Sequence, residues 1–396
     1  MRTVCALSFL VIGLVSSRQA AAYPQFQFSS GTARCTQCHY SPSGGGLLTS
    51  WGRDESADTI STLGGNGGFL HGAVDLPKWL ALGADIRYAL MRHDVGGPAS
   101  PEFAHFPMQF DLYGRASFTD QISLNVTLGA RGIVRPDDGS PAGRLSDTTN
   151  RLVSREHYLM WRASASGPYL RLGRFQAPYG IRFAEHVYYV RRYTGFNLYE
   201  ETYNVSGGYF GEDWEGHVTV FTPPPESFPD PLRSVGYPES GFAAAGEKRV
   251  TDEIALGLQT RIGISSEQAR YQGGAVGKAW FETAKVLLMG EANFIRQQIK
   301  GVNYGQNQFV SYLGATFIPI KGVMAGVAYE RFQENLAVKG TGRNAYNLQI
   351  NFFPYAHIEA VLLGRVQTGG AVGPANRAIS DGSTVSTLMF QLHYYL

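Results

Sequence analysis

The chain has 396 residues, and its 34 Lys and Arg against 32 Asp and Glu give a formal charge of +2. This near balance excludes a dedicated nucleic-acid-binding domain, which would be strongly basic. Charged residues make up only 17%, whereas glycine (48 residues) and aromatic residues (13%) are abundant. Because no long apolar run is present either, the composition excludes a disordered chain and a helical membrane protein and favours a large all-β protein.

Residues 1–22 have the features of a secretory signal peptide. Arg2 supplies a positive start, and residues 6–15 form an apolar stretch too short to span a bilayer as a helix. Ala20 and Ala22 place small residues at a cleavage site. We therefore expect removal of this segment and export of the mature chain, with a short N-terminal anchor as the alternative.

Residues 23–78 differ from the rest of the chain in composition and in sequence pattern. They contain both cysteines of the mature chain and two glycine-rich clusters, at 44–46 and 64–68. Alternation of apolar and polar residues is weak here. The pattern predicts a compact, loop-rich module with one or two short helices.

The module carries the pentapeptide Cys35-Thr36-Gln37-Cys38-His39, the C-x-x-C-H pattern of covalent haem attachment. Two thiols one helical turn apart reach the two vinyl groups of a porphyrin, and the next residue offers an imidazole to the iron. A structural disulfide and a thioredoxin-like redox pair are the alternatives, but no βαβ pattern surrounds the motif. Two cysteines exclude a Cys₄ zinc site. We predict one covalent haem c, attached at Cys35 and Cys38 and ligated by His39.

The second axial ligand of this haem is less directly indicated. His71 is the other histidine of the module, and we predict it as the second metal ligand. Met91, His93, His105 and Met108 follow shortly and are further candidates, and an open or water-bound iron is the remaining alternative. Histidine ligation would lower the reduction potential relative to methionine.

From residue 79 onward the sequence alternates apolar and polar residues in about fifteen segments. Successive side chains of a strand point to opposite faces, so each segment predicts one apolar and one polar face. The predicted apolar faces include Met108, Phe110 and Leu112; Ile254, Leu256, Leu258, Ile262 and Ile264; Tyr346, Leu348, Ile350 and Phe352; and Leu388, Phe390 and Leu392.

The connections between these segments fall into two classes. Some are short turns, such as 119–121 and 321–322, whereas 136–150, 222–250 and 370–383 are long and rich in Gly and Pro. Short turns at one end and long loops at the other are typical of outer-membrane barrels, whose strand numbers are even. We predict an antiparallel β-barrel of 14 or 16 strands over residues 79–396. The alternatives are a soluble β-sandwich and a solenoid, but neither requires so many hairpins in one continuous run.

Residues 151–192 contain eight arginines but only two acids, Glu156 and Glu185. Within this stretch, residues 171–180 resemble the strand-and-turn pattern of phosphate-selective and related trimeric porins. Arginines that face a barrel lumen would favour anions. Ordinary lumen solvation and contact with lipopolysaccharide are the alternatives.

The segment around the haem motif, with Cys35–His39, Pro42, Leu47-Leu48 and Gly52-Arg53, resembles the fused monohaem cytochrome–porin family of the bacterial outer membrane. The resemblance implies a signal peptide at 1–22, a monohaem cytochrome c module at 23–78 and a porin-like barrel at 79–396. It also implies iron(II) oxidation, with electrons passing from extracellular iron(II) to cytochrome-like carriers in the periplasm.

Three functions are compatible with these features. In the first, the haem transfers electrons across the membrane; because the apolar band of a barrel is about 25 Å tall, the module must then insert into the lumen. Glycines at 44–46 and 64–68 would permit the tight turns this requires. The second is a solute (anion) porin whose haem module serves docking or sensing. The third is a peroxidase-like enzyme, for which the sequence supplies no clear distal acid–base pair.

Overall fold

The computed structural model describes residues 24–95, 101–130, 152–197, 200–224, 238–301, 304–369 and 384–396. The expected signal peptide and the predicted loops 136–150 and 370–383 lie outside these residues. Among the described residues, no helix is both long and apolar enough to cross a membrane.

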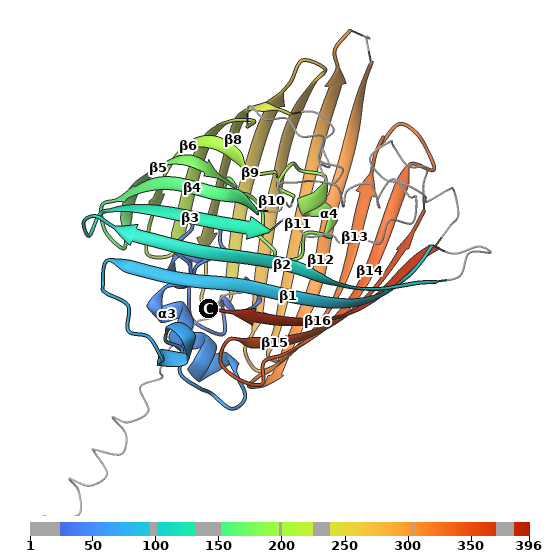
Figure 1. Ribbon diagram of the computed structural model, residues 1–396. Coiled ribbons are helices and arrows are strands. Elements are labelled where there is room, and N and C mark those ends of the chain that lie inside the picture. Colours follow the sequence, from blue (N-terminus) through green and yellow to red (C-terminus); the bar gives the residue numbers. More distant parts are fainter. Residues whose placement is uncertain are drawn as a thin grey trace, which may run out of the picture.

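The described residues form a closed antiparallel β-barrel of sixteen strands, in which each strand pairs with its neighbours in sequence and β1 pairs with β16 (Figure 1). The predicted fold class is confirmed, and sixteen is the strand number. The strands are β1 (Leu80–Asp94), β2 (Glu102–Ser117), β3 (Ile122–Ala130), β4 (Leu152–Arg162), β5 (Gly167–Phe175), β6 (Thr202–Phe210), β7 (Trp214–Thr222), β8 (Ser240–Arg249), β9 (Ile254–Ile264), β10 (Gln268–Phe281), β11 (Val286–Ile299), β12 (Tyr304–Ile320), β13 (Val323–Gln333), β14 (Gly342–Phe352), β15 (Ile358–Thr368) and β16 (Thr384–Tyr395).

One strand lies where the sequence predicts a loop. β8 falls within 222–250, which was assigned to a long connection. Its sequence, Ser-Gly-Phe-Ala-Ala-Ala-Gly-Glu-Lys-Arg, is rich in small residues, so the contrast between its two faces is weak. Pairing with β7 and β9 makes it a strand regardless of this weak pattern.

The outer face of the barrel is apolar and the inner face is polar. Along β9, the even-numbered residues from Ile254 to Ile264 are exposed, whereas Gln259 and Arg261 are buried in the interior. β14 repeats this arrangement, with Leu348 exposed and Asn351 buried. These faces agree with the sequence prediction and suit a surface that contacts lipid around a polar interior.

Aromatic side chains border the apolar surface beside the short turns. The exposed residues there are Trp79, Phe118, Trp161, Trp214 and Phe281. Outer-membrane barrels carry such a girdle at each membrane boundary, and their short turns face the periplasm. The end of the barrel with the short turns therefore corresponds to the periplasmic end of such barrels.

The N-terminal module lies at the short-turn end, beside the C-terminus and partly inside the barrel (Figure 1). Its short helices are η2 (Pro24–Phe26), α2 (Cys35–Cys38), α3 (Ser50–Glu55), η3 (Ser56–Ile60) and η4 (Phe69–Gly72). Thr62 N–H donates to Phe353 O (2.8 Å), and Ala356 N–H donates to Gly64 O (3.0 Å). The module is thus joined through backbone hydrogen bonds to the turn between β14 and β15.

A second segment, the connection 176–201 between β5 and β6, also folds into the lumen and includes α4 (Tyr189–Arg192) (Figure 1). We call it the lumen loop. Ile181, Phe183, Tyr188 and Tyr189 are buried in one cluster with side chains of the barrel wall. The sequence left a further strand open at 185–198, but the described part of this segment, 185–197, forms loop and helix instead.

Candidate functional site

The haem motif forms a single helical turn, α2, with both cysteines at its ends. Gln37 Oε1 accepts hydrogen bonds from the backbone N–H groups of Ala33 (2.8 Å) and Arg34 (3.1 Å), which caps the start of the helix. His39 N–H donates to Cys35 O (2.9 Å) and ends the turn. The two thiols are three residues apart and therefore lie on one side of the helix, as covalent haem attachment requires.

The helix α3 packs directly against the motif. Thr49 N–H donates to Cys38 O (2.9 Å), and a Cβ added at Gly52 would lie 2.4 Å from this same oxygen. Position 52 is therefore closed to any larger residue unless the backbone moves. Leu48 also forms an isolated antiparallel bridge with His39. These contacts hold the motif against a rigid backbone neighbour.

Three successive glycines keep space open beside Cys35. Gly44, Gly45 and Gly46 have φ angles of 71°, 66° and 61°, which side-chain-bearing residues adopt rarely. A Cβ at Gly44 would stand 3.7 Å from Cys35 Sγ, and one at Gly46 would meet the ring of Tyr113 at 3.6 Å. Larger residues would reach toward the thiol and the barrel wall.

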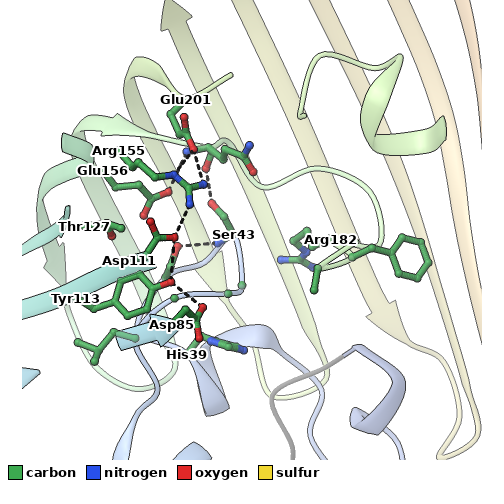
Figure 2. Close-up of a pocket in the computed structure, with 18 of the residues that line it drawn as sticks. His39, Ser43, Asp85, Asp111, Tyr113, Thr127, Arg155, Glu156, Arg182 and Glu201 are labelled. Carbon is green, nitrogen blue, oxygen red and sulfur yellow. Dashed lines mark hydrogen bonds and ion pairs between the residues drawn. The ribbon is translucent and has the colours of Figure 1, made fainter. Parts of the chain in front are cut away.

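A cavity of about 240 Å³ opens between the module, the lumen loop and a wall formed mainly by β1–β4 and β16. The apolar part of its lining includes Leu47, Leu48 and Ile60 from the module and Phe183 from the lumen loop. His39 lies at its boundary (Figure 2). His39 of the motif therefore faces an internal space that is lined by three separate parts of the chain.

Along one wall of this cavity runs a line of charged and polar side chains (Figure 2). Arg155 forms ion pairs with Glu201 (2.8 Å) and Asp111. Tyr113 Oη donates to Asp85 (2.7 Å). Both acids that flank Arg155 are almost fully buried, so the pairing offsets their loss of hydration.

His393 extends this line toward the short-turn end. Its Nε2 lies 3.0 Å from Asp85 Oδ1 and its Nδ1 lies 2.7 Å from Glu359 Oε2. These charged side chains along the wall thus form ion pairs and hydrogen bonds with one another. No group of three or more His, Cys, Asp or Glu suited to a metal ion occurs within the described residues.

Arg182 joins the lumen loop to the module. Its φ of 64° is unusual for a residue with a side chain. Its guanidinium donates to Pro42 O (2.8 Å) and forms an ion pair with Glu215, and these bonds stabilise the strained backbone. Burial raises the pKa of the Cys35 thiol, while the Arg182 charge opposes this shift.

Several arginines of the predicted basic stretch make their contacts in the interior of the barrel. Arg171 is fully buried and donates to Ser41 Oγ (3.1 Å) and Ser43 Oγ (2.9 Å) of the module. Its guanidinium also lies 3.5 Å from the centre of the Phe175 ring. Together with the ion pairs of Arg155 and Arg182, this makes the stretch an anchor for the two inserted segments.

The structure does not bring His71 to the cavity. His71 lies at the short-turn end, where its Nε2 is 3.2 Å from Tyr394 Oη and its ring centre is 5.1 Å from that of His357. It is not among the residues that line the cavity beside His39. Of the further candidates, His105 is on the exposed surface, bonded to Tyr88, and His93 is bonded to Thr387.

Met108 does line the cavity, contrary to the face predicted from its sequence neighbours. The cause is an irregularity in the pairing of β1 and β2: Arg87 pairs with Gln109 and Tyr88 with Pro107, which leaves Met108 between them. A bulge of this kind reverses the direction of a side chain. The remaining candidate, Met91, pairs with Ala104 in β1 and does not line the cavity.

His186 of the lumen loop also lines the cavity, and sequence analysis did not select it. Burial lowers the pKa of His186 to about 3, and the neighbouring arginines, Arg191 first among them, add to this shift. Its imidazole is therefore neutral at physiological pH, the form that binds iron. No motif marks this residue, because its position depends on how the loop folds back into the barrel.

No protein-family model matches the chain, and no curated protein matches its sequence. Solved structures do match its fold. An anion-selective porin from Comamonas acidovorans has 10% identity and a TM-score of 0.58, covering 80% of this chain and 99% of its own. OprB of Pseudomonas putida has 11% identity and a TM-score of 0.59, covering 86% and 99%.

The outer membrane channel DcaP of Acinetobacter baumannii is a third similar structure, with 10% identity and a TM-score of 0.52, covering 80% of this chain and 97% of its own. At such identities the similarity shows the fold. The chain therefore has the barrel fold of bacterial outer-membrane porins.

Proposed function

We propose that this protein transfers electrons across the bacterial outer membrane through one haem c, attached at Cys35 and Cys38 within the barrel lumen. The observation that carries the proposal is the place of the motif: His39 borders a cavity enclosed by the barrel wall and the lumen loop. A haem module hanging below the barrel could not approach a donor on the far side of a membrane.

The residues around the motif fit a haem group. Cys35 and Cys38 would attach it and His39 would ligate the iron, while the glycines at 44–46 leave space beside Cys35. Leu47, Leu48 and Phe183 provide apolar contact for a porphyrin, and Arg182 is within the same lining. When bound, the haem supplies one-electron chemistry at iron, with a potential set by its axial ligands and surroundings.

As the second residue that would ligate the iron we propose His186 in place of the sequence-based choice, His71. His186 lines the same cavity as His39, whereas His71 lies at the short-turn rim against Tyr394. Met108 lines the cavity as well and would give a higher potential than histidine. The visible spectrum distinguishes these ligands, because thioether and imidazole ligation differ.

The direction of transfer that we propose is inward, from extracellular iron(II) to soluble carriers in the periplasm. The short turns of outer-membrane barrels face the periplasm, and the module is at this end. In this arrangement Cys35, Cys38 and His39 would hold the haem between the two compartments. Oxidation of iron(II) at the outer side is the finer part of the proposal and rests on the family resemblance.

The test is reconstitution in liposomes that enclose an electron acceptor. Addition of external iron(II) should reduce the internal acceptor when wild-type protein is present. The matched control is the Cys35→Ala/Cys38→Ala protein, which retains the barrel and lacks haem attachment. Equal reduction with both proteins would overturn the proposal.

A solute porin is the second candidate, and the fold similarity to an anion-selective porin favours it. In this case the barrel would pass small anions and the haem would serve docking or sensing. Swelling of liposomes in anion solutions measures this activity directly. Rapid swelling by the wild-type protein, together with no iron-dependent reduction, would favour the porin.

A further inference from the structure

The outward side of the module carries an exposed aromatic residue beside two acids. Trp51 on α3 is 46% exposed, and Asp54 and Asp58 are exposed as well. These residues are three and four positions apart along α3 and its continuation η3, so they lie on one side of this helical segment. Gly52 and Glu55, on the other side, are buried. We call Trp51, Asp54 and Asp58 the outer patch.

The charge of this side is negative because the arginines of the module point elsewhere. Arg34 donates to Ser166 Oγ (3.3 Å) in the turn between β4 and β5, and Arg53 donates to Leu82 O. Both are buried. Across residues 24–78, the exposed charges are Asp54, Asp58 and Asp75 against Lys78.

Asp54 and Asp58 also act on each other. The pKa of Asp54 is raised by partial burial and by the negative charge of Asp58, while Arg53 opposes the shift. Two neighbouring carboxylates that repel each other gain from the approach of a cation. The outer patch is therefore complementary to a basic surface.

Trp51 of the outer patch is next in sequence to Gly52, which contacts the haem motif. Trp51 precedes Gly52, whose Cα approaches Cys38 so closely that an added Cβ would lie 2.4 Å from Cys38 O. The exposed indole is thus attached to the residue that packs on the attachment helix. A carrier seated on Trp51 would therefore be one residue away from the backbone that packs on the attachment helix.

A membrane-boundary role explains Trp79 but not Trp51. Trp79 directly precedes β1 and belongs to the aromatic girdle of the barrel. Trp51 is on a helix of the module, away from the strands. Exposed acids next to it also disfavour contact with an anionic lipid surface.

We propose that the outer patch is the docking site for a soluble c-type electron carrier with a lysine-rich rim around its haem edge. The proposal rests on the proposed function and names its partner by chemistry. Each encounter moves one electron: the haem iron of this protein goes from iron(II) to iron(III), and that of the carrier goes from iron(III) to iron(II). No bond is made or broken and no proton moves.

The test uses full-length protein in neutral detergent and a basic, soluble c-type cytochrome as the probe. Binding should weaken as salt is added, and Asp54→Asn/Asp58→Asn should raise Kd by about tenfold at low salt, mainly by slowing association. The control is Asp120→Asn/Asp252→Asn, which removes two exposed acids from turns at the same end of the barrel. Equal weakening by both double variants would overturn the specific site.

Trp51 is tested by electron transfer at saturating probe. Trp51→Ala should lower the rate several-fold with little change in the haem spectrum, and Trp51→Phe should retain most of the rate. Unchanged binding in the aspartate variant together with an unchanged rate in Trp51→Ala would overturn the proposal.

The haem-free Cys35→Ala/Cys38→Ala protein separates this proposal from the proposed function. It should bind the probe with the wild-type Kd, because the outer patch does not include the cavity. If wild-type protein carries no haem yet binds the probe through the outer patch, the docking site stands and the electron-transfer function fails. If haem is present and the patch variants bind normally, the docking site fails alone.

Discussion

The lumen holds two inserted segments that differ in how much apolar packing and how many polar contacts retain them. The lumen loop is anchored by aromatic packing, for example by the ring of Tyr193, which stacks on Phe332 at 3.7 Å and 8°. The module combines apolar and polar anchors: Phe26 and Ile60 are buried in one cluster with Met324 and Phe353. In addition, Lys278 of the wall donates to Gln27 Oε1 (2.7 Å) and to Glu247 (2.8 Å). The loop therefore contributes many residues to the main apolar core, whereas the module contributes few and relies more on buried hydrogen bonds and charge.

This difference follows from composition. The buried residues of the module include many polar ones, among them Gln25, Gln27, Thr32, Arg34 and Ser41. A segment of this size with so few apolar residues cannot build its own core. It depends on the barrel as a scaffold, and a covalently attached haem would supply the apolar surface that it lacks.

The strongest test of the module is removal of both thiols. Cys35→Ala/Cys38→Ala should eliminate haem staining in denaturing gels completely, because the thioether attachments are lost. The barrel should persist, so unheated and boiled samples should still migrate differently. Residual staining of the double variant would contradict covalent attachment at these positions.

The polar anchor of the module is tested at Lys278. Lys278→Met leaves the buried Glu247 without its positively charged partner, with only the hydrogen bond from Gln27 Nε2 (3.2 Å) remaining among the described residues. The change should cost about 3–5 kcal/mol and lower the temperature of heat-modifiable unfolding. Combining it with Glu247→Gln should recover part of the loss. If the single and double variants unfold alike, the ion pair does not determine how the module is held.

The apolar anchor of the lumen loop is tested at Tyr193. Tyr193→Ala removes the stacked ring and should destabilise the loop by about 3–4 kcal/mol, while Tyr193→Phe should cost about 1 kcal/mol for the lost hydrogen bond with Arg343. Single-channel recordings should show larger or noisier conductance in the alanine variant. Quiet, wild-type recordings from it would contradict a lumen closed by this packing.

The smallest expected change concerns the iron ligand. His186→Ala should alter the visible spectrum toward a high-spin form while the covalent haem remains, because an axial imidazole is lost. His71→Ala, which changes a histidine outside the cavity lining, should leave the spectrum unchanged. The reverse result would assign the ligand to His71 and show that the lumen loop does not contact the iron.

Much of the barrel was predictable from alternation alone, since one face must meet an apolar environment and the other a polar one. β9 and β14 follow this pattern residue by residue. β8 was missed because alanine and glycine give its two faces similar polarity. Met108 was assigned to the wrong face because a bulge depends on the pairing with β1, which no local pattern records.

The sequence by itself determined the strand faces and the candidate haem motif, because periodicity and C-x-x-C-H spacing are local properties of the chain. Only the tertiary structure decided that the motif borders a cavity inside the barrel and that His186 and Met108 share this cavity while His71 does not. It also turned the arginine-rich stretch into an anchor, through contacts such as that of Arg171 with Ser41 and Ser43. The physical reason is that closing a barrel brings together residues more than a hundred positions apart, and such contacts have no signature in local sequence.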